Sequence, residues 1–410
     1  MKILMIEDFF HPQAGYQLNV LAPYLVKYGH EVTIMCGEMD RFPDYLTGFF
    51  GKDGLSDKDR SFTEETGVKI IRIPVQKYIS GRAIFDKIVF EKAKEMTPDV
   101  IYAHGNDSYN GMQFLLKQKM FNCPVLSDSH MVDMASTNKF ASVYRAIYRL
   151  FVTPVIKKNK NIIIRTVDDP FIIKSYGIPK EQAPVVGFGS DTRKFHPDKS
   201  VKAEMRRELG ISDDEIVVVY AGKLDEFKGG LFLAESIHDK IEIQGAKLRF
   251  LLIGNISGDK AKETGELLDQ SENNLLMYPT QVYSDLPKWF QTADVAIFPK
   301  QCSLTYYDVL ACGLPVLVED NPIGEQRAKE CGATFTFKSG NKDNFRNKLI
   351  EIVNAIMMEK ENNEKHRFED IALDYILKNY NYEKQAREYE KIITDVFNQN
   401  NDNKLKITER

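Results

Sequence analysis

The segment EIVVVYAGKLDEFKGG, residues Glu215 to Gly230, decides the fold of half of this chain. A β-branched apolar run ends at Tyr220, a glycine-bounded turn follows, and an apolar helical pattern begins near Gly230. A buried strand that leads through a tight turn into a helix is the repeating unit of a parallel α/β sheet. Lys223 and Lys228 lie in the turn, where a helix N-terminus already favours an anion. We therefore expect a diphosphate site here, although a solvated surface turn can have the same composition.

The same alternation of short β-branched runs and longer helical patterns continues along the chain and predicts two parallel sheets, one after the other. The predicted strands of the first sheet are Lys2 to Glu7, Glu31 to Cys36, Val68 to Pro74, Asp99 to Gly105, Pro124 to His130 and Asn161 to Val167. Those of the second are Glu215 to Gly222, Leu248 to Gly254, Ala293 to Pro299 and Leu314 to Asp320. The predicted fold class is α/β, with two Rossmann-like doubly wound domains.

Chain length supports two domains, because 410 residues exceed the roughly 250 to 300 at which a single core stops growing. Gly, Pro and charged residues cluster at Val185 to Ser200, which we interpret as the interdomain hinge. We expect an N-terminal domain at residues 1–190 and a second domain at 197–378. Helical patterns follow Asn341 up to about Phe397, and residues 398–410 read as a polar tail. The segment Gly37 to Gly67 is interpreted as a substrate flap or as simple disorder.

Composition excludes several classes of partner. The net charge of -4 gives no reason to expect nucleic acid, and the five cysteines lack the spacing of a disulfide framework or a zinc site. Asp57 and Asp59 have the spacing of a metal-binding pair, but they stand in a charged segment and are interpreted as solvated. The N-terminus does not resemble a signal peptide, and no apolar run approaches the ~18 to 20 residues that span a bilayer. We therefore expect a cytoplasmic protein.

Polar residues follow several of the predicted strands. His104, His130 and Gly15 come after strands of the first domain, and Lys223 comes after a strand of the second. Ligands of open α/β sheets bind beyond the carboxyl ends of the strands, so these residues are candidates for a cleft between the domains. Either histidine alone is more often a cap or a satisfied core group. Asp308, early in a short helix, can accept two ribose hydroxyls or can simply suit the helix dipole.

Five segments, in family order, resemble glycosyltransferase family four, the retaining enzymes of GT-B fold, also described as group 1 glycosyl transferases. They are GHEVTI (Gly29 to Ile34), PDVIYAHG (Pro98 to Gly105), GFGSDTRKFHP (Gly187 to Pro197), AGKLDEFKGG (Ala221 to Gly230) and YDVLACGLPVL (Tyr307 to Leu317). The resemblance implies that the two domains face each other across a cleft and that a C-terminal helix, at about 380–397, crosses back to the first domain. It also implies a nucleotide-sugar donor bound by the second domain and an acceptor bound by the first.

The resemblance also assigns roles to residues. Lys223 and Lys228 match the cations that hold the donor diphosphate, and His130 matches the histidine near the reacting sugar carbon; these three form the expected catalytic set. Asp308 takes the place of the glutamate that binds the ribose. Gly15 matches the first of two glycines in the N-terminal loop, and Tyr16 replaces the second. The expected donor-binding residues are Gly15, Gly222, Lys223, Lys228, Ser303, Leu304, Thr305 and Asp308, with Tyr16 and His104 on the acceptor side.

The implied activity is that of a retaining, metal-independent hexosyltransferase without a cofactor, which transfers a sugar to a glycan or lipid-linked glycan of an envelope polysaccharide. Positive charge at Lys223 and Lys228 would stabilise the departing nucleoside diphosphate, and its phosphate would accept the acceptor's proton. One residue departs from the family pattern: Lys300 stands where a glutamate is usual, so the contacts to the donor sugar must differ. A nucleotide-sugar epimerase of related fold and an inactive nucleotide-sugar-binding subunit remain as alternatives.

Two predicted helices have a composition compatible with an anionic membrane surface. They are Lys77 to Lys94 and Tyr144 to Lys160, and the second mixes basic with apolar side chains and is expected to kink at Pro154. Peripheral contact with the inner face of the cytoplasmic membrane is the hypothesis that follows. The alternative is an ordinary amphipathic helix that packs its apolar side on the first sheet.

Overall fold

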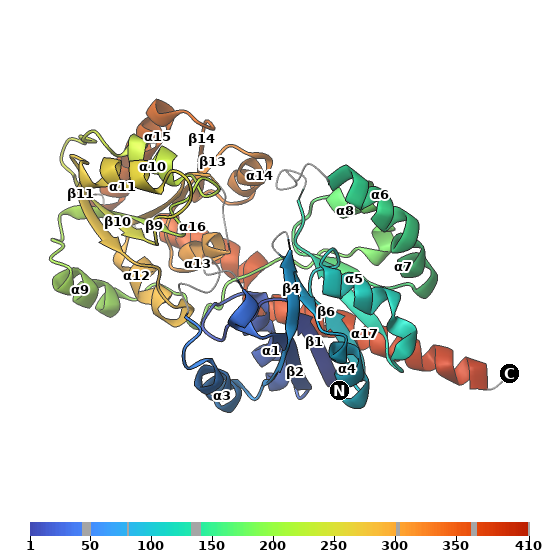
Figure 1. The fold of residues 1–410 in the computed structure, drawn as a ribbon. Coiled ribbons are helices and arrows are strands. Elements are labelled where there is room, and N and C mark those ends of the chain that lie inside the picture. The colour runs from blue at the N-terminus through green and yellow to red at the C-terminus, as the bar shows by residue number, and fades with distance from the viewer. Residues whose placement is uncertain (43–50, 80–81, 133–140, 301–303, 362–366, 409–410) are drawn as a thin grey trace. The chain divides into compact units, whose positions relative to one another are not determined.

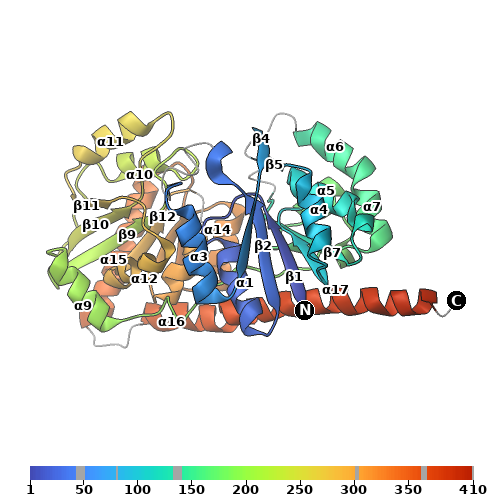
Figure 2. The ribbon, with the colours of Figure 1, turned by 60° about the horizontal axis from the view of Figure 1, so that its bottom comes forward.

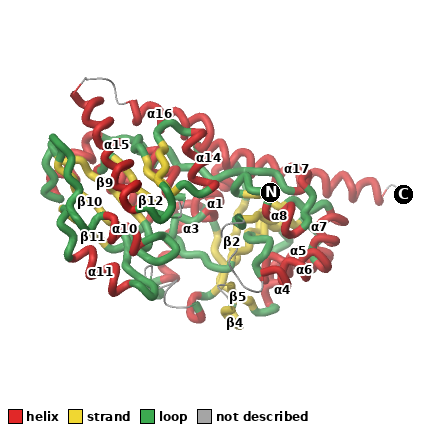
Figure 3. The backbone as a smooth tube through the Cα atoms, turned by 90° about the horizontal axis from the view of Figure 1, so that it is seen from above, coloured by secondary structure: helices red, strands yellow, loops and turns green. Residues whose placement is uncertain are grey.

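In the computed structural model, residues 1–42, 51–79, 82–132, 141–300, 304–361 and 367–408 are described (Figure 1). The chain divides into two compact units, the first made of residues Met1–Phe188 and Glu383–Arg410 and the second of Gly189–Tyr382. Sequence placed these divisions at 190 to 197 and at 378 to 380. Each unit contains one six-stranded sheet, and Figure 3 shows strands of each unit lying between helices.

The sheet of the first unit has the strand order β3-β2-β1-β6-β7-β8, with all neighbours parallel. Its strands are β1 (Lys2–Glu7), β2 (Glu31–Gly37), β3 (Lys69–Ile73), β6 (Val100–Ala103), β7 (Val125–Ser129) and β8 (Ile163–Arg165), and a two-stranded hairpin adds β4 (Val75–Ile79) and β5 (Arg82–Phe85). Its helices are α1 (Gln17–Lys27), α3 (Leu55–Thr66), α4 (Ile88–Glu95), α5 (Tyr109–Leu116), α6 (Ala141–Phe151), α7 (Thr153–Asn159) and α8 (Phe171–Tyr176). The central strands are buried on both faces, which is why they read as continuous apolar runs.

The sheet of the second unit has the equivalent order β11-β10-β9-β12-β13-β14, again parallel throughout. Its strands are β9 (Glu215–Ala221), β10 (Lys247–Ile253), β11 (Asn274–Tyr278), β12 (Val295–Phe298), β13 (Val316–Glu319) and β14 (Thr334–Phe337). Its helices are α9 (Lys199–Glu208), α10 (Gly230–Ser236), α11 (Ala261–Asp269), α12 (Leu286–Thr292), α13 (Thr305–Ala311), α14 (Pro322–Glu330), α15 (Lys342–Glu361) and α16 (Arg367–Tyr375).

All ten predicted strands are confirmed, and the predicted fold class with them. The strands β11 and β14, at the edges of the second sheet, were missed. The predicted helix Lys77 to Lys94 is wrong over its first half, which forms the β4–β5 hairpin; only α4 is helical. The break expected at Pro154 is confirmed, since α6 ends at Phe151 and α7 begins at Thr153.

Two interpretations of polar segments need correction. Part of the expected flap is the helix α3, and Asp59 within it is not solvated: its carboxylate pairs with the Arg72 guanidinium at 2.7 Å, and both side chains are largely buried. Asp57 does remain exposed. The expected polar tail is helical as far as Thr408, because no Gly or Pro after Tyr382 interrupts the helix.

The C-terminal helix α17 (Tyr382–Thr408) belongs almost entirely to the first unit, as the resemblance implied, and Figure 2 shows it as one long helix. Tyr389 holds it there: its hydroxyl donates to the Val186 carbonyl at 3.1 Å and accepts from the Gln17 amide at 2.9 Å. Along the chain, the second unit therefore lies between two segments that both belong to the first unit. Among the described residues, no helix is both long enough and apolar enough to cross a membrane.

Candidate functional site

The sheet orders mark one point in each unit where a ligand fits. From the first strand of each sheet, β1 or β9, the chain adds two strands on one side and then crosses to add three on the other side. Open α/β sheets bind ligands at such a switch point, beyond the carboxyl ends of the strands. In the first unit these ends lead to Glu7 and His104, and in the second they lead to Gly222 and Lys300.

In the second unit, the loop after β9 is shaped by close backbone contacts. The Gly222 N–H donates to the Ile253 carbonyl at 2.9 Å, and a Cβ at Gly254 would lie 1.7 Å from the Gly222 oxygen. No larger residue fits at Gly254 without moving one strand end. The Tyr220 hydroxyl donates to the Lys223 carbonyl at 2.6 Å, which fixes the backbone on the far side of the turn. Gly222 therefore lies in an ordered loop, as a ligand-binding role requires.

The two predicted diphosphate ligands lie in this loop. The Lys223 side chain is exposed, and Lys228 is half-buried. Asp225 orders the segment between them: its carboxylate accepts the Lys228 N–H at 2.8 Å, and its carbonyl accepts the Gly230 N–H at 2.8 Å. The helix that follows, α10, has only seven residues, so the lysine side chains supply more of the positive charge than the helix end does.

Lys300, the departure from the family pattern, lies beside the same loop. Its ammonium donates to the Glu226 carbonyl at 3.2 Å, and its Cβ lies close to Gly229. The loop thus gains a third lysine where the family has a carboxylate. Of the neighbouring predicted donor contacts, Leu304 and Thr305 begin α13 and are half-buried, and Ser303 lies outside the described residues.

Asp308 is more enclosed than its expected role suggested. The side chain is 4% exposed, and the Ser190 hydroxyl donates to its Oδ1 at 2.7 Å. Burial raises the pKa of Asp308 to about 7; the Ser190 hydrogen bond opposes this shift, and the charge of Asp191 adds to it. The carboxylate therefore ties α13 to the segment that enters the second unit. Its predicted contact with a ribose stays a prediction.

In the first unit, strand register brings a row of ionisable side chains together. Ile6 of β1 pairs with Ala103 of β6, which pairs with Ser127 of β7. The next residues, Glu7, His104 and Asp128, therefore come side by side. His104 lies between the two carboxylates, with Nε2 3.3 Å from Glu7 and Nδ1 2.9 Å from Asp128.

His130 completes this row. Its Nε2 lies 3.3 Å from Asp128 Oδ2, and its ring centroid lies 4.6 Å from that of His104. Asp128 itself is fully buried: the Tyr102 hydroxyl donates to Oδ2 at 2.6 Å, and the Gly105 N–H donates to Oδ1 at 2.7 Å. One buried carboxylate thus orients both predicted histidines.

The charges of this cluster are strongly coupled. Burial alone would lower the pKa of His104, but the charges of Asp128 and Glu7 outweigh burial and raise the pKa to about 9. Burial would likewise raise the pKa of Asp128, yet the two histidines hold it well below its usual range. Burial raises the pKa of Glu7 to about 7. Loss of water contact, together with the charge of His104, lowers the pKa of His130. At neutral pH, His104 is therefore cationic, and Glu7 can give or take a proton.

Two further features border this cluster. Asp8 is buried, its Oδ1 accepts from the Asn110 amide at 2.7 Å, and its Oδ2 has no hydrogen-bond partner among the described residues. Such an oxygen is costly unless a ligand or water reaches it. Gly15 has the left-handed backbone conformation, with φ at 69°, and turns the loop after β1 into α1. Tyr16, its neighbour, is 49% exposed, and its predicted place on the acceptor side stays a prediction.

His104, Asp128 and His130 also have the atoms to ligate a metal, all within 4.8 Å of one another. Protons already account for their arrangement, however. Asp128 Oδ2 accepts the Tyr102 hydroxyl and faces both imidazoles, and His104 keeps its proton at neutral pH. A metal would have to displace that proton. The expectation that no metal is needed stays a prediction.

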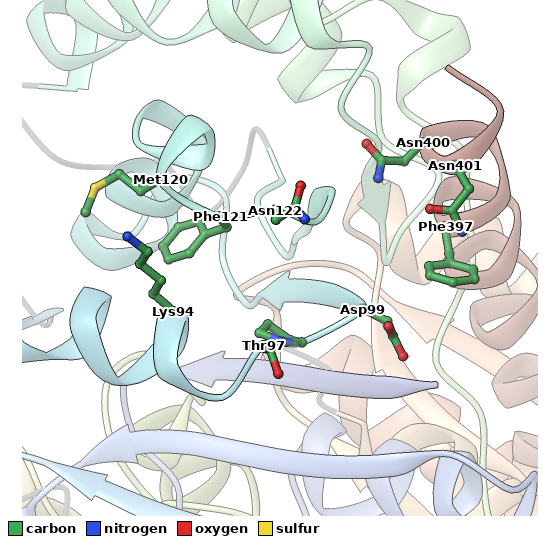
Figure 4. Close-up of a pocket in the computed structure, with 10 residues that line it drawn as sticks. Lys94, Thr97, Asp99, Met120, Phe121, Asn122, Phe397, Asn400 and Asn401 are labelled. Atoms are coloured by element: carbon green, nitrogen blue, oxygen red, sulfur yellow. The ribbon is translucent and has the colours of Figure 1, made fainter. Parts of the chain in front are cut away.

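The first unit also has hollows away from these residues. One of about 380 Å³ is lined by Lys94, Asp99, Met120 and, from α17, Phe397 (Figure 4). Asp99 directly precedes β6, so this hollow lies at the amino ends of the strands, opposite to the candidate site. Another, of about 460 Å³, is lined by Glu38, Asp40, Arg41, Pro74, Val75, Gln76 and Asp86. Neither contains a predicted site residue.

Residues 215–355 match the family described as Glycosyl transferases group 1. The second unit belongs to this family. A curated relative of this chain, the D-inositol 3-phosphate glycosyltransferase of Segniliparus rotundus, is 27% identical over 172 residues, which cover 40% of this chain and 37% of the relative. The lipopolysaccharide 1,2-N-acetylglucosaminetransferase of Salmonella typhimurium is 22% identical over 223 residues, which cover 52% and 55% of the two chains. The chain thus spans only about half or less of these relatives.

Likeness to solved structures extends beyond the group 1 unit. The structure of Anabaena Alr3699/HepE in complex with UDP and glucose aligns with this chain with a TM-score of 0.68 at 14% sequence identity. The alignment covers 96% of this chain and 100% of the Anabaena chain. At this identity the likeness shows the fold alone. Both units together therefore have the GT-B fold.

Sequence reasoning named Gly222, Lys223 and Lys228, which the structure places in one loop of the group 1 unit. It also named His104 and His130 of the first unit. It missed Glu7, Asp8 and Asp128, which complete the histidine cluster. The available signal was their position: Glu7 ends the first predicted strand, Asp8 follows it directly, and Asp128 comes two residues before His130. Acidic residues in an otherwise apolar, buried strand rarely lack a partner.

Proposed function

We propose that this protein is a retaining glycosyltransferase that moves a sugar from a nucleotide-sugar donor to a glycan or lipid-linked glycan acceptor in envelope polysaccharide synthesis. The observation that carries the proposal is the loop after β9. Gly222 and Gly254 bring the backbones of two strand ends together there. Lys223 and Lys228 lie in the loop, and Lys300 lies beside it. Its place in the group 1 unit and at the switch point of the sheet supports a diphosphate ligand.

The proposed mechanism divides the work between the two units. Breaking the bond between sugar and phosphate builds negative charge on the nucleoside diphosphate, and Lys223 and Lys228 stabilise that charge. His130 contacts the sugar near its reacting carbon, and Asp128 fixes the orientation of the His130 ring. The leaving phosphate accepts the acceptor's proton, so no separate general base is required. We expect turnover to persist when metal ions are chelated.

The positive charge of Lys300 gives a reason to test acidic donor sugars. An ammonium group at this position suits a sugar that carries a carboxylate better than the usual glutamate would. The donor panel therefore includes nucleotide-linked uronic acids beside neutral hexoses and N-acetylhexosamines.

The first test is a thermal-shift screen with uridine, guanosine and adenosine diphosphates. A ligand at about 100 times its Kd stabilises the folded state by about 2.7 kcal/mol. We expect one diphosphate to raise the Tm and the matching nucleotide sugar to be slowly hydrolysed. Proton NMR of the transferred sugar then reports whether the anomeric configuration is retained. A shift without hydrolysis would indicate the inactive nucleotide-sugar-binding subunit, and no shift with any diphosphate would contradict the proposed donor site.

A second candidate is a nucleotide-sugar epimerase. The buried acid-base cluster of Glu7, His104 and Asp128 favours it, because proton transfer at a sugar carbon needs groups that titrate near neutral pH. Incubation in deuterated water separates the two. Deuterium in the recovered nucleotide sugar indicates an epimerase, and unlabelled donor with free diphosphate indicates a transferase.

We also propose that the protein acts in the cytoplasm. Cys36, Cys312 and Cys331 are buried thiols outside any disulfide, as is usual in a reducing compartment.

A further inference from the structure

The helix α6 exposes an apolar stripe to solvent. Its inner side is made of tyrosines: Tyr148 is buried, and its ring packs 4.6 Å from that of Tyr176 in α8. On its outer side, the four side chains with the largest apolar exposure are Val143 at 59%, Ile147 at 53%, Leu150 at 67% and Phe151 at 60%. Figures 1 and 2 show α6 beside α7 at the edge of the first unit.

The spacing of these residues places them on one face. Positions 143, 147, 150 and 151 follow the i, i+4, i+7, i+8 pattern of a single helical stripe. Fifteen large hydrophobic side chains are exposed among the described residues, and four of them belong to this one helix of 11 residues. Single exposed apolar residues need no explanation, but a contiguous stripe marks an interaction surface. Tyr148, Val152 and Ile156 do pack in the core of the first unit, as the alternative of an ordinary amphipathic helix requires. The exposed stripe of α6 is a further apolar face that this packing leaves uncovered.

Within the segment that forms α6 and α7, the formal charge is of one sign. Between residues 141 and 160 the chain has five Lys or Arg and no Asp or Glu, although the whole chain has a net charge of -4. Lys157, Lys158 and Lys160 are exposed at the end of α7. Arg149 is exposed on α6 and donates to the Lys174 carbonyl. The surface thus combines an apolar stripe with a cationic border.

We propose that the α6–α7 surface, residues 141–160, docks on an anionic lipid membrane. An amphipathic helix in the plane of the interface inserts its apolar side chains among the acyl chains while lysines contact the lipid phosphates. A second copy of this chain is a poorer occupant, because a symmetric contact through this surface sets its cations against the same cations. The proposal does not rest on the glycosyltransferase activity, since binding to vesicles requires no donor.

Vesicle flotation with the full-length chain tests the proposal. One set of vesicles is pure phosphatidylcholine, and the other contains about one third phosphatidylglycerol. We expect the wild-type protein to float with the anionic vesicles and to bind the neutral ones at least about tenfold more weakly. High salt should release much of the bound protein, because screening weakens the cationic contacts.

Two variants separate the apolar from the cationic contribution. Leu150→Asp with Phe151→Asp should reduce partitioning by about tenfold or more, because the stripe loses its two most exposed apolar groups. Lys157→Glu with Lys158→Glu should reduce binding to anionic vesicles by a similar factor. The matched control is Met120→Asp with Met358→Asp, two exposed apolar residues outside the stripe at 46% and 60%, which should float like the wild type.

Three outcomes would overturn the proposal. The first is no flotation with anionic vesicles. The second is equal loss in the control variant, which would point to general destabilisation. The third is a concentration-dependent dimer that disappears in the Leu150 and Phe151 variant without any lipid binding, which would identify the surface as a self-interface. Circular dichroism and the Tm of each variant show whether it is folded.

Discussion

The first and second units share a strand order, yet their strand ends carry different chemistry. At the ends of β1, β6 and β7, buried acids and histidines pair with one another and have shifted pKa values. At the ends of β9 and β12, glycines shape the backbone around lysines that reach solvent. The first arrangement holds protons in fixed places, and the second leaves positive charge available to an anion. The same sheet thus supports two kinds of site, according to whether side chains or backbone occupy the switch point.

The largest effect is expected where the second unit loses its positive charge. Lys228→Ala should lower donor turnover by about 10²- to 10³-fold, because one group that stabilises the leaving diphosphate is removed. The fold should persist, since the side chain is only half-buried and Asp225 bonds to the backbone of Lys228. Steady-state hydrolysis of the donor measures the turnover. A thermal-shift titration with the nucleoside diphosphate shows whether the variant is folded.

The matched control for this variant is Lys262→Ala. Lys262 is exposed on α11 and pairs with Glu266 at 3.7 Å on the surface of that helix, so its loss should leave turnover unchanged. Near wild-type turnover in Lys228→Ala would remove this residue from the proposed site.

In the first unit, Asp128→Asn should break the proton-holding cluster. An amide of the same shape leaves the His104 imidazolium with a single carboxylate, Glu7, so the pKa of His104 should fall below about 9. Removing one partner from a buried ion pair costs on the order of 3 kcal/mol of unfolding free energy. NMR titration of the histidine rings and urea unfolding at pH 7 measure these effects.

The pH dependence of this variant gives a sharper test. The folded-state pKa of His104 lies above its unfolded value near 6.5, so the stability it contributes is complete below that value and is lost as the pH rises through about 9. The stability difference between wild type and Asp128→Asn should therefore shrink in that range. A difference that is constant from pH 6 to 10 would mean that Asp128 acts through packing alone.

Asp308 offers a comparable test in the second unit. Its folded-state pKa of about 7 lies above its ordinary value of 3.8, so ionisation destabilises the folded state and stability falls as the pH rises between these values. Each unit of pKa difference corresponds to about 1.4 kcal/mol. Asp308→Asn keeps an acceptor for Ser190 and should remove this decline. Unfolding by urea at pH 5 and pH 8 measures it, and an unchanged decline in the variant would assign it to another group.

These sites differ in how far the sequence alone could reveal them. The lysine loop was predictable because Gly222, Lys223 and Lys228 lie within one strand-turn-helix unit, where local pattern fixes the geometry. Glu7, His104 and Asp128 meet only because β1, β6 and β7 are neighbours in register, which depends on the order of the whole sheet. The β4–β5 hairpin was missed for the same reason. Its two strands are defined by their pairing with each other, and no local hydrophobic periodicity marks them as strands. The central parallel strands were readable, since burial on both faces demands continuous β-branched runs, whereas the half-buried edge strands β11 and β14 were not.

The smallest expected effect concerns the segment where the chain passes between the units. A Cβ at Gly189 would lie 2.3 Å from the Tyr380 carbonyl oxygen, and Ser190 next to it exchanges backbone hydrogen bonds with Tyr380 and Tyr382 at 2.9 Å. Gly189→Ala should therefore push apart the two segments by which the chain passes between the units. We expect it to lower the unfolding free energy by about 1 to 3 kcal/mol. The Tm and the urea midpoint measure the loss.

Gly265→Ala is the opposite case and the control. Gly265 lies inside α11, and the nearest atom to a new Cβ would be 3.8 Å away, an ordinary contact. Alanine there should stabilise the protein by about 0.5 to 1 kcal/mol, because the helix gains propensity without a clash. If both alanine variants shifted the unfolding free energy in the same direction, the close backbone approach at Gly189 would not be what holds the two crossing segments together.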